Sequence, residues 1–503
     1  MQLRQPTRLL LLGLFLGFAF DLLFNGKMPG VSVPLFALLL VLGVALTLRW
    51  EAAGAIGSNL WLPAALLLFA AMTAIRANGF LILLNMCVCL GLLSLIAVYL
   101  TQRTTTRLLL PEVILAPLQA LGLALYHSIR VMGQARRSDL VAVPRESRGR
   151  VLPVLRGLLL ALPVLVVFIA LLTSADLIFA EWVQALLDLD ILAMLWSWVR
   201  HGLVILLIGV PVAGALAYTA RARKAGSATG AAWLTPPRFI GATEGLVVIN
   251  SVNILFAIFV GLQLTYLFGG LANITSSGFT YAEYARRGFA ELVLVALLTL
   301  GLVYVLRDIS RLDSPKTSLA FKVSATILVG LTCVMLVSAF RRLLLYETAY
   351  GFTELRIYVH VFMVWLGLLL TWFGLTLWRP GANFGTGLIV VVLGFVLTLD
   401  LLNPDALIVR QNAQRYQGLL PSISSQYVEE KIDVNYLTRL SDDAVPALIE
   451  LANSTTGEVH DVLDKDLRAR LSTRKQDEEW RRWQSYHLSR WTGFTLLSRY
   501  VGE

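Results

Sequence analysis

The sequence predicts an all-α protein in which a polytopic bundle of about eleven transmembrane helices precedes a small α-helical extracytoplasmic C-terminal domain. Of its 503 residues, 57% are hydrophobic and only 15% are charged, and the mean hydropathy is +0.72. An ordinary globular domain has about 45–50% apolar and about 25% charged residues. Because one membrane anchor uses only about 20 apolar residues, most of this chain is expected to lie in lipid.

Eleven apolar runs are long enough to cross about 30 Å of hydrocarbon. They lie near residues 9–24, 33–48, 60–75, 80–100, 151–173, 202–219, 245–269, 288–306, 319–340, 357–378 and 384–402. The first run follows Arg4 and Arg8, as in a signal peptide, but no small-residue cleavage site comes after it. We therefore expect it to be retained as a span.

Residues 108–126 are also apolar, but they contain Pro111, Glu112 and Pro117. We predict an interfacial or re-entrant helix here, because a further span would put the arginine-rich residues that follow on the outer side. Residues 127–150 then form a basic cytoplasmic loop, in which the stretch from Arg130 to Arg150 is available to a cytoplasmic partner or to anionic lipid. Residues 1–403 together form the predicted transmembrane domain.

The distribution of Lys and Arg predicts the orientation of the bundle. Loops on the side of the N-terminus contain 19 of these residues, whereas the opposite loops and helix ends contain eight. Positive residues favour the cytoplasmic side of a membrane. The N-terminus is therefore expected in the cytoplasm and, with an odd number of spans, the C-terminal domain is expected outside.

Residues 404–503 have the composition of a soluble domain, with 13 basic and 15 acidic residues. Start and stop signals predict helices over about 404–416, 441–452, 459–474 and 478–500. The last of these would carry aromatic residues along one side, namely Trp480, Trp483, His487, Trp491 and Phe494. They fit docking on the membrane surface or packing in the core of the tail, and the scarcity of other large apolar residues favours the core.

Two predicted spans on the outer side open with the same motif. These are Gly288-Phe289-Ala290-Glu291-Leu292 and Gly351-Phe352-Thr353-Glu354-Leu355, which lie 63 residues apart. A glutamate in the first turn is also typical of an ordinary helix start, because the carboxylate complements the positive end of the helix dipole. The arginines beside the motifs are less easily explained, because external arginine opposes the usual charge asymmetry.

These charged residues form the candidate ligand-binding site. Its members are Glu283, Arg286, Arg287, Glu291, Glu354 and Arg356. The guanidinium groups can pair with the glutamates, or they can bind a phosphate group bidentately. The leading hypothesis is therefore binding or transport of an anionic lipid or lipid-linked ligand at the outer leaflet.

The same stretches carry a family resemblance. Residues 280–289 and 350–358 resemble signature stretches of a bacterial polytopic membrane family of unknown function, DUF4173, and of its relative DUF4153. Further similar stretches are residues 20–26, 155–158, 403–410 and 433–446. The resemblance implies a multi-pass protein of the bacterial cytoplasmic (inner) membrane, but it brings no known activity, cofactor or catalytic residue.

Other functional classes are weaker or excluded. The chain has no phosphate-binding glycine-rich loop, no His-Glu-x-x-His motif and scattered histidines, so we predict no metal site and no cofactor. Basic residues lie in short loops rather than on one face, which argues against nucleic acid as a partner. Whether the protein is an enzyme stays open.

Two alternatives remain. An integral-membrane glycosyltransferase that uses a lipid-linked sugar would use Asp21, near the outer end of the first span, as a base or sugar-positioning carboxylate. The other alternative is a structural or sensory partner protein. Asp21 and Asp400 both lie near outer helix ends, where we expect their carboxylates to reach the membrane surface.

Overall fold

The computed structural model describes residues 3–51, 59–99, 110–135, 191–225, 238–268, 289–379, 382–419 and 432–502, with a few single residues between 168 and 179. Across these residues ten helices are long and apolar enough to cross a membrane. The predicted all-α polytopic bundle is thereby confirmed, and the chain is a multi-pass membrane protein.

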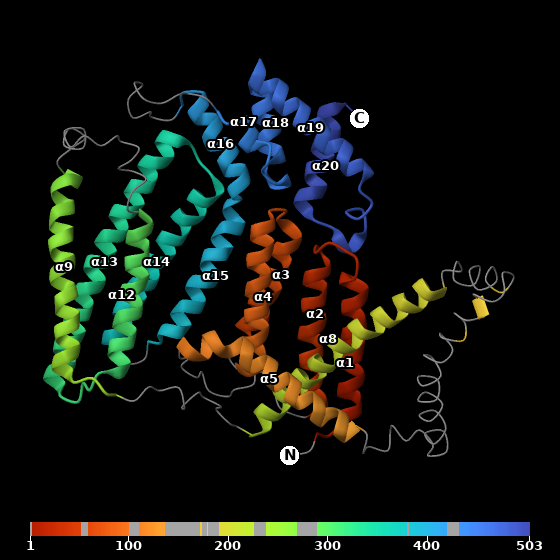
Figure 1. Ribbon diagram of the computed structural model, residues 1–503, viewed down its shortest axis with the longest axis horizontal. Coiled ribbons are helices and arrows are strands. Elements are labelled where there is room, and N and C mark those ends of the chain that lie inside the picture. Colours follow the sequence, from red (N-terminus) through yellow and green to blue (C-terminus); the bar gives the residue numbers. More distant parts are fainter. Residues whose placement is uncertain are drawn as a thin grey trace.

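The helices form two groups that meet between α15 and α4 (Figure 1). The first group consists of α1 (Pro6–Phe24), α2 (Ser32–Trp50), α3 (Trp61–Ile75), α4 (Gly79–Tyr99), α5 (Leu110–Ala135) and α8 (Ile191–Ala225). The second consists of α9 (Ala242–Phe268), α12 (Phe289–Ile309), α13 (Pro315–Tyr350), α14 (Glu354–Trp378) and α15 (Phe384–Leu402). Phe321 and Phe373 are buried in the core of the second group. Val396 of α15 packs with Leu66 and Phe69 of α3 in the core of the first group.

Close backbone contact joins α1 to α8. A Cβ atom at Gly17 would lie 2.3 Å from the carbonyl oxygen of Ile205, and one at Gly13 would lie 2.5 Å from that of Gly209. Small residues four apart allow membrane helices to approach in this way, because lipid provides no hydrophobic force between them. The two glycines of α1 therefore permit its close packing against α8.

The observed helices match the predicted spans with three differences. Helix α3 has only 15 residues, which is short for a span, and the predicted span 151–173 lies outside the described residues apart from single positions. Helix α5 runs on to Ala135, so the beginning of the predicted loop 127–150 is helical, and α5 is one of the ten helices long and apolar enough to cross a membrane. Figure 1 shows α5 inclined across the end of the bundle at which the N-terminus lies. An interfacial location for α5 stays a prediction.

The tail domain covers one end of the bundle, which we call the tail side (Figure 1). It comprises α16 (Pro404–Tyr416), α17 (Val434–Leu437), α18 (Val445–Ser454), α19 (Glu458–Gln476) and α20 (Leu488–Val501). Leucines of α18 and α19, with Ile408 and Val409 of α16, form its core. The first helix has the predicted bounds, because Asn403 caps it and Pro404 occupies its first turn.

The predicted helix over 478–500 is wrong in its first half. Helix α20 begins only at Leu488, and a short 3₁₀ turn, Trp483–Ser485, precedes it. The Trp480 indole donates a hydrogen bond to the carbonyl oxygen of Arg474 and so folds the chain back against the end of α19. Trp480 and His487 are buried and Phe494 packs against the tail core, whereas Trp483 and Trp491 are 56% and 50% exposed, so core packing explains only part of the aromatic set.

Candidate functional site

The structure describes three of the six predicted site residues. Glu283, Arg286 and Arg287 lie in residues 269–288, outside the described part of the chain. Glu291 lies in the first turn of α12 and is exposed, and Glu354 is the first residue of α14. Both Gly-Phe-x-Glu-Leu motifs therefore begin helices, as predicted.

Glu354 and Arg356 do not form an ion pair in the described structure. The Glu354 carboxylate accepts a hydrogen bond of 2.8 Å from the Asn78 side chain, and its backbone N–H donates to the Tyr436 hydroxyl at 2.9 Å. Arg356 donates to the carbonyl oxygens of Tyr350 and Gly351 and stacks over the Tyr346 ring, 4.3 Å from its centroid. Glu354 of the motif and Arg356 directly after it therefore contact different residues.

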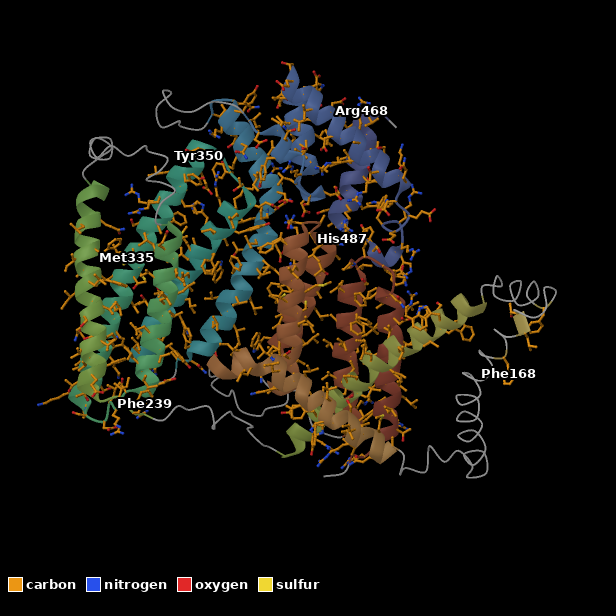
Figure 2. The ribbon with its side chains drawn as sticks, in the orientation of Figure 1. Phe168, Phe239, Met335, Tyr350, Arg468 and His487 are labelled. Carbon is orange, nitrogen blue, oxygen red and sulfur yellow. The ribbon has the colours of Figure 1, made fainter. Side chains whose placement is uncertain are left out.

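Arg356 has a second guanidinium group beside it. Arg415 of α16 approaches Gly351, because a Cβ atom built on Gly351 would lie 3.0 Å from Arg415 Nη1. Burial, followed by the positive charge of Arg356, lowers the pKa of Arg415. Two half-buried cations that act on each other electrostatically favour an anion beside them. Tyr350, which is labelled in Figure 2, is exposed beside them on the tail side.

Glu354 belongs instead to a cluster of carboxylates at the junction between the bundle and the tail. The side-chain nitrogen of Asn78 donates to Glu354 and, at 3.1 Å, to both carboxylate oxygens of Asp405. The Ser441 hydroxyl and N–H also donate to Asp405. Asp443 accepts the backbone N–H groups of Ala77 and Asn78 at 2.9 Å each. We call Asn78, Glu354, Asp405, Ser441 and Asp443 the junction cluster.

Helix starts explain why the acids converge. Asn78 precedes α4, Glu354 begins α14, Asp405 lies in the first turn of α16, and Asp443 lies in the turn that leads into α18. The positive ends of four helices therefore point toward one region and favour negative charge there. Burial raises the pKa of Asp405, to which Glu354 also contributes, and burial raises the pKa of Asp443.

His487 of the tail contacts the ends of bundle helices beside the junction cluster. It is buried between α20 and the ends of α2 and α3, with its ring nitrogens facing the carbonyl oxygens of Arg76, at 3.2 Å, and Pro29 (Figure 2). Burial, followed by the charge of Arg490, lowers the pKa of His487. Ser489 binds the Ile75 carbonyl oxygen at 2.7 Å, so α20 is tied to the end of α3.

Two further pairs of polar residues lie within the helices. Asp21, the catalytic residue of the enzyme alternative, is buried 2.6 Å from Nδ1 of His201 on α8, and Asn25 donates to the same carboxylate at 2.7 Å. Glu347 of α13 pairs with His360 of α14 at 2.9 Å. Each acid therefore has a local partner, and the expectation that Asp21 reaches the membrane surface is not met.

Metal binding finds no support in the described residues. Among them no group of three or more His, Cys, Asp and Glu side chains could hold a metal ion. The junction acids are instead separated by neutral donors from Asn78 and Ser441. The carboxyl groups of the junction cluster can therefore bind protons or share the hydrogen bonds of Asn78 and Ser441.

Sequence reasoning missed five members of these sites, namely Asn78, Asp405, Ser441, Asp443 and Arg415. Asn78 carries one local signal, because an Asn-Gly pair before a long apolar run is typical of a helix cap. Its other bonds connect it to residues more than 270 positions away, and no local pattern indicates such contacts.

Comparison with known proteins gives one match. The model of a domain of unknown function, DUF4153, matches residues 64–451. This range includes the last eight helices of the bundle and the start of the tail, with every member of the junction cluster. The resemblance drawn from the sequence is confirmed. The chain matches no curated protein and no solved structure.

Proposed function

The chain belongs to the DUF4153 family, and from the site on its tail side we propose that it binds an anionic lipid or a lipid-linked phosphate. The ligand would sit against the guanidinium groups of Arg356 and Arg415. Movement of such a ligand across the membrane would extend the same proposal. The charge asymmetry of the loops supports an orientation in which this side faces the outer leaflet of a bacterial inner membrane and the N-terminus lies in the cytoplasm.

The observation that carries the proposal is the proximity of two guanidinium groups without an acidic counterpart for Arg356 in the described structure. Arg356 donates only to backbone carbonyl oxygens and stacks on Tyr346. Phosphate satisfies paired guanidinium groups bidentately, and a tyrosine-rich rim suits the headgroup region. A lipid would reach the pair from within the membrane plane, because Tyr350 and Leu355 beside it are exposed.

Replacement of both arginines tests the proposal. We expect the Arg356→Gln/Arg415→Gln protein, purified in mild detergent, to lose most of its co-purifying phospholipid or lipid phosphate, measured by mass spectrometry. Arg410→Gln is the matched control, because it removes one charge from the same helix at an exposed pair with Glu450. Lipid retention equal to that of the wild type in the double variant would contradict the proposal.

The arginines of the first motif extend the same site. Arg286 and Arg287 precede α12 as Arg356 follows the start of α14, and we propose that they contribute to the same binding surface with Glu283, Glu291 and Glu354. Arg286→Gln/Arg287→Gln should then weaken retention of phospholipid in the same assay. Unchanged retention would confine the site to Arg356 and Arg415.

A second candidate function rests on the contact between Asp21 and His201. A carboxylate that holds one nitrogen of an imidazole fixes the ring so that the other nitrogen can exchange protons with a substrate hydroxyl group. The His201 side chain is 41% exposed, so the ring is partly open to solvent. A lipid-linked sugar transferase predicts that Asp21→Asn abolishes transfer from a labelled lipid-phosphate sugar while lipid retention is unchanged. Equal transfer by the variant would exclude this role.

A further inference from the structure

Asp400 and Asn85 form a buried polar pair inside the bundle, on the tail side. Asp400 lies in the last turn of α15 and Asn85 lies in the second turn of α4, and both are completely buried. The Asn85 side-chain nitrogen donates to Asp400 Oδ1 at 2.9 Å. The sequence suggested that Asp400 reaches the surface, and the structure corrects this, because the tail and α4 cover it.

The pair lacks hydrogen-bond donors. Asp400 Oδ2 and Asn85 Oδ1 are both buried without a partner in the described part of the chain. The two hydrogens of the Asn85 amide are already used, one on Asp400 and one on the carbonyl oxygen of Leu81 at 2.9 Å. Turning the amide over would place oxygen against these two acceptors, so its orientation is fixed by its partners.

The charges around Asp400 do not neutralise it. Arg76, at the end of α3, donates from Nε to the backbone oxygen of Asp400 at 2.6 Å rather than to its carboxylate. The turn before α18 contributes a second acid, Asp443. From α14, Tyr358 packs in the apolar cluster around Leu399. The one nearby cation is opposed by a second acid and does not bind the Asp400 carboxylate, and a buried carboxylate without a bound cation is costly within a membrane.

From this geometry we propose that Asp400 and Asn85 form a proton-binding site. A proton from the tail side would convert the Asp400 carboxylate into a carboxylic acid. Its O–H group then supplies the donor that the pair lacks, and the charge is removed from the bundle interior. This site lies apart from the arginine pair of the proposed function and does not depend on it.

The junction cluster provides a path of exchangeable groups. Glu354 is only half-buried and shares the Asn78 amide with buried Asp405. The Ser441 hydroxyl contacts both Asp405 and, at 3.4 Å, Asp443, which acts electrostatically on Asp400. Carboxyl and hydroxyl groups in such a series can pass a proton from solvent to a buried acid.

Infrared difference spectroscopy of the full-length protein in lipid nanodiscs tests the site. Between acidic and alkaline pH the wild type should show the C=O stretch of a protonated carboxyl group, and Asp400→Asn should lose that component. Glu450→Gln is the matched control, because it removes an exposed tail carboxylate and should leave the component unchanged. An identical pH-dependent spectrum in the Asp400→Asn protein would overturn the proposal.

A second variant keeps the test decisive if Asp400→Asn does not fold. Asn85→Ala removes the donor that stabilises the ionised carboxylate, so the midpoint of the carboxyl signal should shift to higher pH. An unmoved midpoint in this variant would refute the assignment. Replacing potassium with sodium should leave the titration unchanged, whereas a sodium-dependent loss of the signal would identify a metal cation as the ligand and overturn the proposal.

Discussion

Asn78 connects more of the structure than any other single side chain at the junction. Its oxygen accepts the N–H groups of Phe80 and Leu81 at the start of α4, and its nitrogen donates to the carboxylates of Glu354 and Asp405. One short amide thereby caps a membrane helix and holds two helices of other parts of the chain. A carboxylate at this position could accept the cap bonds but could not donate to the acids.

Loss of the Asn78 side chain should destabilise the whole junction. Asn78→Ala removes a helix cap and the donor between two carboxylates, and together these losses should cost about 2–4 kcal/mol. Thermal unfolding in detergent, with proteolytic release of the tail as a second readout, measures the effect. Asn435→Ala, at an exposed position in α17, should change stability by less than about 0.5 kcal/mol. Equal stability of the two variants would contradict the role of Asn78.

At the scale of residues, the sequence indicates which residues belong to a site better than it indicates which residues they contact. Arg356 was selected because external arginine opposes the usual charge asymmetry, and Glu354 because it repeats the motif beside it; in the structure Glu354 bonds Asn78 and Arg356 stacks on Tyr346. Their partners Asn78, Tyr436 and Arg415 could not be selected, because their contacts depend on how four helix starts meet in space. Asp400 was placed wrongly for the same reason, since burial by a distant segment leaves no local pattern.

At the scale of elements, apolar runs and caps predict most helices because each signal lies within the helix itself. The break before α20 escapes such reasoning. Residues 478–487 have a helical pattern, but the Trp480 indole bonds the end of α19 and His487 bonds the connection between α1 and α2. Tertiary hydrogen bonds here outweigh a local preference worth only a few tenths of a kcal/mol per residue.

Packing of α1 against α8 leads to a prediction for Gly17. In Gly17→Ala the new methyl group would meet the backbone of Ile205 and Gly209, which cannot move aside as a side chain can. The two helices must separate, and we expect a loss of about 1–3 kcal/mol of stability. Gly91→Ala in α4 is the control, because nothing lies within 4 Å of its added Cβ atom. Thermal unfolding of both proteins in detergent compares them, and equal midpoints would rule out close packing at Gly17.

At the scale of the whole molecule, the tail and the bundle form one structure. The DUF4153 match itself runs across their boundary at residue 404, and so do the hydrogen bonds of the junction cluster. Composition predicts the boundary because charge density changes there. The docking of the tail is not visible in composition, because it depends on a small number of buried polar contacts between segments distant in sequence.

Docking of the tail on the bundle also sets the level of the tail's aromatic residues relative to the ends of the bundle helices. The Val31 N–H donates to the carbonyl oxygen of Tyr486 at 3.0 Å, and Arg482 donates to that of Gly26 at 3.2 Å. Both contacts lie at the connection between α1 and α2, at the tail-side ends of these helices. Trp483 and Trp491 flank this level and are exposed, with Arg481 and Arg482 nearby. Tryptophan with adjacent arginine is favoured at the headgroup level of a bilayer.

Brominated phospholipids in nanodiscs should therefore quench Trp483 and Trp491. Because the chain has 12 tryptophans, the contribution of each is measured by difference, and Trp483→Phe and Trp491→Phe should each reduce the quenchable fraction of the fluorescence. Trp480→Phe is the matched control, since Trp480 is buried in the tail a few residues away and bonded to Arg474. If the three variants lose quenching equally, or if none of them does, the tail does not rest on the bilayer through this face. A reduction confined to the two exposed tryptophans would place the tail domain against the headgroups, beside the end of the bundle where the arginine pair and the junction cluster lie.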